Sequence, residues 1–165
     1  MRRLMAYLLA AVFGIVSGFG IASAYEIDQV CDSTMNDSFA MGQHVLVKYM
    51  DIDDADTLQR GDVVLFPNQM YMETGEGDVM MKRIIGMPGE WVSMEDGVVY
   101  IDGRPLDESD YLVQRGFGDD MSRRYVGANQ YFVLGDHRTN STDSRSETVG
   151  MVKEKDLLGK VIYQW

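Results

Sequence analysis

The sequence predicts a mainly β domain preceded by one N-terminal transmembrane helix. One observation is a long uncharged run near the N-terminus; the other is a series of short apolar, β-branched runs separated by turn residues over the rest of the chain. Helical periodicity is weak outside the first run. A chain of 165 residues has room for one membrane segment and one compact domain.

The first element is an uncharged run of 22 residues from Leu4 to Tyr25, which directly follows Arg2 and Arg3. About 20 apolar residues suffice to cross the hydrocarbon core as a helix. The positive-inside bias places the two arginines in the cytoplasm and the remainder of the chain outside. We therefore expect a single-pass protein of the cell membrane.

The expected domain organisation follows from this anchor. The alternative is a cleaved signal peptide, because Ala22-Ser23-Ala24 has the small residues of a cleavage site. The apolar run is longer than the roughly 7–15 residues usual for such a segment, which favours a retained anchor. The expected parts are a cytoplasmic tail at 1–3, a transmembrane anchor at 4–25 and an extracytoplasmic catalytic domain at 26–165.

Short apolar runs after the anchor predict the strands of the domain. Asp96-Gly97 between two such runs is a strong hairpin signal, because glycine accepts the positive φ of the turn. Residues 68–78 and 114–128 are polar and glycine-containing, so we expect exposed irregular loops there. The expected strands lie at 44–48, 62–66, 90–94, 98–101, 131–134 and 157–163.

Charge and composition exclude several classes of function. The part after the anchor carries all 26 acidic residues and 13 of the 15 basic ones, since Arg2 and Arg3 precede it, so its charge is near −13. Such a charge argues against nucleic acid as a partner. Two histidines and one cysteine are too few for a protein-made zinc site, so no metal or cofactor is expected. We expect the single cysteine, Cys31, to be a small apolar filler.

Four segments carry side chains suited to hydrolytic chemistry, and each taken alone has an ordinary structural explanation. Lys82 among apolar neighbours is explained as an edge lysine that reaches solvent. The hydroxyls of Ser33 and Thr34 are explained as caps of a turn. The four segments are residues 32–39, 60–64, 82–90 and 135–145.

Taken in this order and spacing, the segments resemble the type I signal peptidase family, serine–lysine proteases that remove signal peptides from exported proteins. Residues 82–90, Lys-Arg-Ile-Ile-Gly-Met-Pro-Gly-Glu, resemble the family's lysine box. Residues 135–145, Gly-Asp-His-Arg-Thr-Asn-Ser-Thr-Asp-Ser-Arg, resemble its closing box, with His137 where an asparagine is usual. The resemblance covers residues 33–165 and the anchor. It implies a mostly antiparallel, barrel-like or sandwich β domain of the signal-peptidase and LexA-like type.

The resemblance also implies roles for individual residues. Peptide hydrolysis by a hydroxyl needs a base, and a lysine can serve only when neutral, a form that apolar burial favours. By resemblance Lys82 is this general base, and Ser141 is the serine whose hydroxyl orients it. Met35 and Ile85 are expected to line shallow pockets for small substrate side chains. Residues expected to brace the site as polar and ionic support are Asp136, Arg138, Asp143 and Arg145.

The first box departs from the family pattern Ser-Met-x-Pro-Thr. The matching residues are Thr34-Met35-Asn36-Asp37-Ser38, so Thr34 stands at the nucleophile position and Asp37 at the proline position. Threonine keeps the hydroxyl, but its methyl group restricts χ1. A misfit of about 1–3 kcal/mol would slow the reaction about 5- to 150-fold. Ser33 is the alternative nucleophile, through a slip of one residue.

The negative charges near the first box argue against catalysis. Asp32 and Asp37 flank the place where an oxyanion would develop, and negative charge there opposes acyl transfer. A carboxylate close to Lys82 would also favour its charged form.

Two functions therefore remain open. The first is a membrane-bound endopeptidase that acts on preproteins with Ala-x-Ala-type signal peptides through Thr34 and Lys82. The alternative is a non-catalytic homologue that binds exported proteins or assists surface assembly. A self-cleaving regulator is disfavoured by the membrane run and by the absence of a basic DNA-binding segment. Membrane lipid is an expected partner, through the anchor and through Tyr25 at the interface. Met70, Tyr71 and Met72 are explained equally well as interfacial side chains and as part of a plain loop. The sequence does not indicate an oligomeric state.

Overall fold

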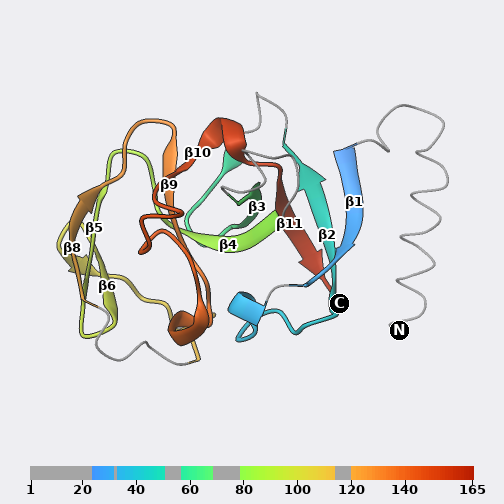
Figure 1. The fold of residues 1–165 in the computed structure, drawn as a ribbon, viewed down its shortest axis with the longest axis horizontal. Helices are drawn as coiled ribbons and strands as arrows, with labels where there is room; N and C mark the ends of the chain where they lie inside the picture. Colours follow the sequence, from blue (N-terminus) through green and yellow to red (C-terminus); the bar gives the residue numbers. More distant parts are fainter. Residues whose placement is uncertain (1–23, 32, 51–56, 69–78, 114–119) are drawn as a thin grey trace.

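The computed structural model of the chain describes residues 24–31, 33–50, 57–68, 79–113 and 120–165 (Figure 1). Within them the regular structure consists of strands and short 3-10 turns. The strands are β1 (Tyr25–Gln29), β2 (His44–Tyr49), β3 (Val63–Pro67), β4 (Val79–Gly86), β5 (Trp91–Glu95), β6 (Val98–Ile101), β7 (Arg104–Pro105), β8 (Met121–Tyr125), β9 (Gln130–Leu134), β10 (Val152–Lys153) and β11 (Gly159–Gln164). The 3-10 turns are η2 (Ser33–Met35), η4 (Arg138–Asn140) and η5 (Glu154–Asp156).

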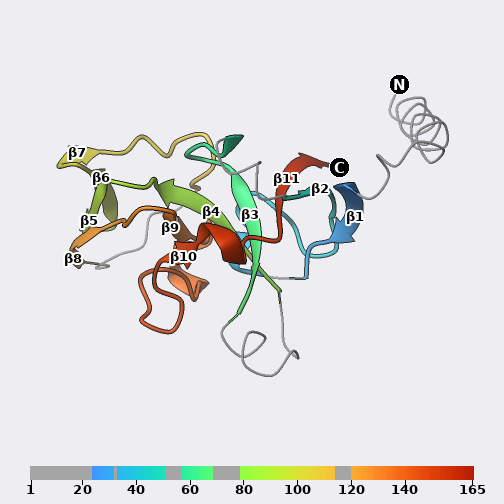
Figure 2. The ribbon, with the colours of Figure 1, turned by 90° about the horizontal axis from the view of Figure 1, so that it is seen from above.

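These strands form two antiparallel sheets. The larger sheet has seven strands in the order β1-β2-β11-β3-β4-β9-β10, and the smaller has four in the order β7-β6-β5-β8. Figure 2 shows the small sheet at one end of the domain and β1, β2 and β11 at the other, with β4 running between them. The predicted mainly antiparallel β fold is confirmed.

The strongest local prediction is also confirmed. Strands β5 and β6 form a hairpin in which Glu95 pairs with Val98. The two residues between them, Asp96 and Gly97, have φ angles of 49° and 73°. Both values are positive, as a type I′ turn requires, and this turn matches the right-handed twist of the flanking strands.

Elsewhere the structure differs from the sequence-based expectation. The irregular loop expected at 114–128 contains β8, which pairs with β5 through Trp91 and Tyr125. The sequence of β8, Met-Ser-Arg-Arg-Tyr, has no apolar run, and only Met121 of this strand is buried. Strand β1 begins at Tyr25, the last residue of the expected anchor.

Several expectations fall outside the described residues. They concern most of the anchor at 4–25, Asp32 and the interfacial residues Met70, Tyr71 and Met72. Within the described ranges, no helix has the length and apolarity needed to cross a membrane.

The hydrophobic core lies on both faces of the large sheet and in the joint between the sheets. On β3, Val63 and Leu65 enter one cluster while Val64 and Phe66 enter another, which follows the period-2 alternation of a strand. The third cluster lies between the sheets, where Phe132 of β9 packs with Val92 of β5. These clusters fix the positions of β3, β4 and β9.

The joint between the sheets leaves no space at Gly86, the last residue of β4. A Cβ there would lie 2.5 Å from Val92 Cγ2 and 2.9 Å from Phe132 Cβ. Glycine therefore allows β4 to pass directly beneath the small sheet.

Candidate active site

Lys82 lies in the middle of β4 and is fully buried. Its backbone pairs with Val64 of β3, one of the core residues of the large sheet. The Nζ atom lies 2.6 Å from Thr34 Oγ1 and 3.1 Å from the carbonyl oxygen of Met81. The structure thus brings together the two residues predicted to be base and nucleophile.

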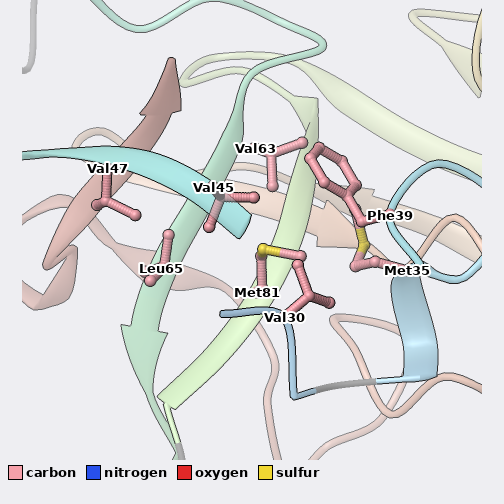
Figure 3. Close-up of a cluster of buried hydrophobic side chains, with 8 residues drawn as sticks. All are labelled: Val30, Met35, Phe39, Val45, Val47, Val63, Leu65 and Met81. Carbon is pink, nitrogen blue, oxygen red and sulfur yellow. The ribbon is translucent and has the colours of Figure 1, made fainter. Parts of the chain in front are cut away.

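The Thr34 turn, residues 33–39, is held in place by apolar side chains on its C-terminal side. Met35 is fully buried and Phe39 is 5% exposed. Figure 3 shows both side chains in the cluster formed with Val63 of β3 and Met81 of β4. The backbone N–H of Phe39 donates to the Met35 carbonyl at 2.7 Å, which closes the turn. Burial of Met35 therefore fixes the position of the residue before it.

The closing loop, residues 135–146, contacts the other side of this turn. The backbone N–H of His137 donates to the Thr34 carbonyl at 2.9 Å. A Cβ on Gly135 would lie only 2.7 Å from that carbonyl oxygen. Glycine at 135 thus permits the close approach of the two segments.

Ser141 occupies a tight position beside Gly135. Its Oγ would lie 2.2 Å from a Cβ built on Gly135. This Oγ is buried and has no hydrogen-bond partner among the described residues. The structure therefore places Ser141 in the site region but gives its hydroxyl no hydrogen bond to Lys82.

Asp143 and Arg145 brace the closing loop from within. Asp143 is fully buried and accepts hydrogen bonds from the backbone N–H of Gly135 at 3.1 Å and from Arg145 Nε at 2.8 Å. Arg145 also donates to the carbonyl of Arg138 at 2.8 Å. These bonds connect both ends of the loop, the support expected of this pair.

Asp136 and Arg138 each form a buried ion pair with a residue that has no role in the sequence-based prediction. Asp136 Oδ2 lies 2.5 Å from Arg83 Nη2, and Arg138 Nη2 lies 2.5 Å from Glu108 Oε1. Arg83 directly follows Lys82 in the lysine box, so its place in the sequence could have marked it as a residue of the site. Glu108 follows β7 and carries no sequence signal.

Tyr111 completes this network. Its hydroxyl donates to Glu108 Oε1 at 3.0 Å, and its ring lies 4.2 Å from the Arg83 guanidinium carbon. Burial, followed by the negative charge of Glu108, raises the pKa of Tyr111 above its usual range, while the charges of Arg138 and Arg83 oppose this. Tyr111 therefore remains a hydrogen-bond donor to Glu108.

Asp37 contacts the closing loop. The expectation from the sequence was a carboxylate beside the developing oxyanion and Lys82. Asp37 Oδ1 lies 3.0 Å from His137 Nδ1, and 14% of the Asp37 side chain is exposed. The carboxylate that was expected to oppose catalysis beside Lys82 is thus engaged by an imidazole. Asp32, the second carboxylate of that expectation, lies outside the described residues.

A cleft of about 700 Å³ opens beside Thr34 and Lys82. Its apolar walls come from Val30, Val45, Leu65, Val79, Met80 and Met81. Ser33, the alternative nucleophile, also lines the cleft, but the hydroxyl bonded to Lys82 is that of Thr34. A cleft with these aliphatic walls can hold an extended peptide with small side chains.

Three residues lie elsewhere than the sequence indicates. Met35 and Ile85 were expected to line substrate pockets, but both are fully buried in core clusters and neither lines the cleft. Ile85 packs instead in the joint between the sheets, in the cluster that contains Val92 and Phe132. Cys31 is exposed and lines the cleft, so the expectation of a buried filler is wrong.

A hydroxyl hydrogen-bonded to a buried lysine amine on an antiparallel β domain is the arrangement of the hydroxyl–lysine class of peptidases. The family model described as "Signal peptidase, peptidase S26" matches residues 1–165. The chain therefore belongs to the signal peptidase I family.

Individual relatives agree with this assignment. Signal peptidase I S of Bacillus subtilis (strain 168) is 33% identical over 93% of this chain and 82% of its own length. A crystal structure of a signal peptidase I from Enterococcus faecalis V583 is 33% identical, with a TM-score of 0.51 over 64% of this chain and 97% of that one. The inactive signal peptidase IA of Staphylococcus aureus (strain Mu50) is 25% identical over 98% of this chain and 91% of its own length. The family thus includes both active and inactive members.

Proposed function

We propose that this protein is an active, membrane-anchored signal peptidase in which Thr34 is the nucleophile and Lys82 the general base. The observation that carries the proposal is the distance of 2.6 Å between Lys82 Nζ and Thr34 Oγ1, with the lysine fully buried. A candidate base must lie within hydrogen-bond distance of the proton that it removes, and this pair meets that requirement.

The reaction proceeds in two stages. In the first, Thr34 Oγ1 attacks the scissile carbonyl carbon while its proton moves to the neutral Lys82 amine. The tetrahedral intermediate collapses, the C–N bond breaks, and the proton on Lys82 passes to the leaving amine, which leaves an ester on Thr34. In the second stage Lys82 removes a proton from water, the resulting hydroxide attacks the ester, and the proton returns to Thr34 Oγ1.

The substrate class follows from family membership and from the cleft. We infer preproteins whose signal peptides end in an Ala-x-Ala-type sequence, with the products released outside the cytoplasm. The cleft walls of Val30, Val45 and Leu65 support this inference, because aliphatic side chains favour small apolar groups over charged ones. The proposed organisation is a cytoplasmic tail at 1–3, an anchor in lipid at 4–25 and the catalytic domain at 26–165.

Cleavage of an Ala-x-Ala preprotein by the full-length protein in detergent tests the proposal. Lys82→Ala should abolish cleavage, because no base then remains on Thr34. Thr34→Ser should cleave at the parent rate or up to about 150-fold faster, depending on how much the methyl group hinders attack. Thr34→Ala is the control for Ser33, since cleavage that survives this change would assign the nucleophile to Ser33.

The second candidate function is a non-catalytic homologue that binds exported proteins or assists surface assembly. It is favoured by the threonine at position 34, and a relative named as inactive shows that the family contains such members. No cleavage by the parent, with cleavage gained by Thr34→Ser, would establish this second function and overturn the first.

A further inference from the structure

Two residues that depart from the family pattern of the catalytic boxes contact each other. Asp37 stands where the pattern has proline, and His137 stands where it has asparagine. Asp37 Oδ1 lies 3.0 Å from His137 Nδ1, although the residues are 100 positions apart in the sequence. Because an ionised carboxylate only accepts hydrogen bonds, the imidazole Nδ1–H is the donor.

We propose that Asp37 and His137 form a positioning pair that holds the Thr34 turn against the closing loop. The effect of the pair on cleavage rests on the peptidase function proposed above, whereas its effect on the turn does not. Neither residue contacts the scissile bond in this proposal; both act through the position of Thr34.

The first argument is that His137 binds the turn at two places. Its backbone N–H donates to the Thr34 carbonyl at 2.9 Å, and its side chain binds the Asp37 carboxylate. These two bonds lie on either side of Met35, whose side chain is fully buried in the core. The turn is therefore held at residues 34, 35 and 37, and the first of these carries the hydroxyl bonded to Lys82.

The second argument is what proline would otherwise contribute. Proline fixes φ near −65° and so restricts the backbone of a loop. Aspartate does not, and the main-chain bonds of this segment include one of 3.2 Å from the Asn36 N–H to the Ser33 carbonyl. A side-chain hydrogen bond to a neighbouring loop restricts the same backbone from outside.

The third argument is the pairing of the surrounding charges. Asp136 and Arg138 flank His137 in the sequence, but their side chains pair with Arg83 and Glu108 respectively. Arg83 Nη2 also donates to Ser38 Oγ at 3.3 Å, next to Asp37. The carboxylate of Asp37 is thus left to the imidazole, and the two side chains match as hydrogen-bond donor and acceptor.

Hydrogen exchange at the His137 amide tests the pair without any need for activity. In the full-length protein in detergent, Asp37→Ala should raise the exchange rate of this amide about fivefold, the effect expected from the loss of one partly exposed side-chain hydrogen bond. The matched control is Lys160→Ala, which breaks the Lys160–Asp62 pair of 2.7 Å with side chains 26% and 18% exposed. This control should leave exchange at His137 unchanged, and an unchanged rate in Asp37→Ala would overturn the proposal.

Steady-state cleavage by the same variants tests the positioning role. Asp37→Ala and His137→Ala should each lower kcat about fivefold with little change in KM, and the double variant should lose no more than either single one. Asp37→Pro combined with His137→Asn should recover kcat, because the proline restores the restriction that the pair supplies. Faster exchange with unchanged kcat, or additive losses in the double variant, would overturn the positioning role while leaving the peptidase function intact. If neither the parent nor Thr34→Ser cleaves, the peptidase function fails, and the exchange result alone decides whether the pair holds the turn.

Discussion

The closing loop and the Thr34 turn meet at the Thr34 carbonyl but are stabilised in different ways. The loop carries Asp136 and Asp143, both fully buried in ion pairs, and Arg138, which is 2% exposed. The turn relies on the buried Met35 and on a pair in which the His137 side chain is 38% exposed.

This difference indicates which half of the site tolerates change. Buried charges cannot lose their partners without a large cost, so substitutions in the buried ion pairs of the closing loop should be poorly tolerated. An ion pair near solvent is worth little and is easily replaced by another restraint. The departures at positions 34 and 37 fall in the turn, and the departure at 137 is the loop residue that contacts it, while Asp136, Arg138, Asp143 and Arg145 match the closing box.

The largest expected effect comes from breaking the buried pair of Arg138 and Glu108. Glu108→Ala leaves the guanidinium of Arg138 buried without its carboxylate and should lower the free energy of unfolding by about 3–5 kcal/mol. The matched change in the turn, Asp37→Ala, should lower it by only about 0–1 kcal/mol. Urea unfolding followed by tryptophan fluorescence measures both. Equal losses in the two variants would contradict the contrast between the two regions.

A methyl group at Gly135 should separate the two regions. In Gly135→Ala the new Cβ would lie 2.2 Å from Ser141 Oγ and 2.7 Å from the Thr34 carbonyl oxygen. Displacement of Thr34 by about 1 Å should reduce kcat/KM for preprotein cleavage about 100-fold.

Gly86→Ala is the control for this change, because its Cβ would also clash, but with Val92 and Phe132 in the joint between the sheets. It should lower stability while the folded fraction cleaves at the parent rate. If cleavage by both glycine variants falls only in proportion to their unfolded fraction, the close contact between loop and turn at Gly135 does not position Thr34.

Substitution of Ser141 tests the comparison within the closing loop. Its buried Oγ has no hydrogen-bond partner among the described residues, so Ser141→Ala removes an unsatisfied polar group. We expect the free energy of unfolding to stay the same or to rise by about 1 kcal/mol, while cleavage falls if the hydroxyl turns to Lys82 when substrate binds. A clear loss of stability would mean that the hydroxyl is satisfied in solution. Ser144→Ala is the contrasting control, because Ser144 Oγ accepts a hydrogen bond of 2.9 Å from the Val133 N–H and its loss should destabilise.

The smallest expected effect concerns Tyr111, which donates to Glu108. Burial and the Glu108 charge raise its pKa in the folded protein above that of the unfolded chain. A raised folded pKa means that this contribution to stability is complete below about pH 10 and is lost as the pH rises above that value. Thermal unfolding between neutral pH and pH 11 should therefore show a steeper alkaline decline in the parent than in Tyr111→Phe. If thermal stability falls equally with pH in the parent and in Tyr111→Phe, Tyr111 is not the cause of the alkaline decline.

Much of the fold and part of the site could be predicted from the sequence. The β5–β6 hairpin follows from Asp96-Gly97, since the turn chemistry acts between neighbouring residues. The strands β2, β3, β9 and β11 follow from their apolar runs. Strand β8 was missed, because it is largely exposed and its residues, Met-Ser-Arg-Arg-Tyr, form no apolar run.

In the site, the sequence indicated Lys82, Thr34 and the closing loop, but not the partners that position them. Glu108 and Arg83 act through contacts made across the fold; Arg83 adjoins Lys82 in the lysine box, whereas no local pattern identifies Glu108. Met35 and Ile85 were assigned to the substrate pockets, yet the packing of the sheets buries both in the core. Burial depends on which face of a strand meets a neighbouring element, and the residue type alone does not decide this.

The sequence by itself determined the class of fold and the family and indicated Lys82 as the candidate base, because turn preferences, apolar alternation and box residues are all local features. Only the tertiary structure decided which hydroxyl reaches Lys82, where the cleft lies and what Asp37 contacts. Thr34 and Lys82 are 48 positions apart, and Asp37 and His137 are 100 apart. Contacts over such separations follow from strand register and core packing, which emerge only when the sheets assemble.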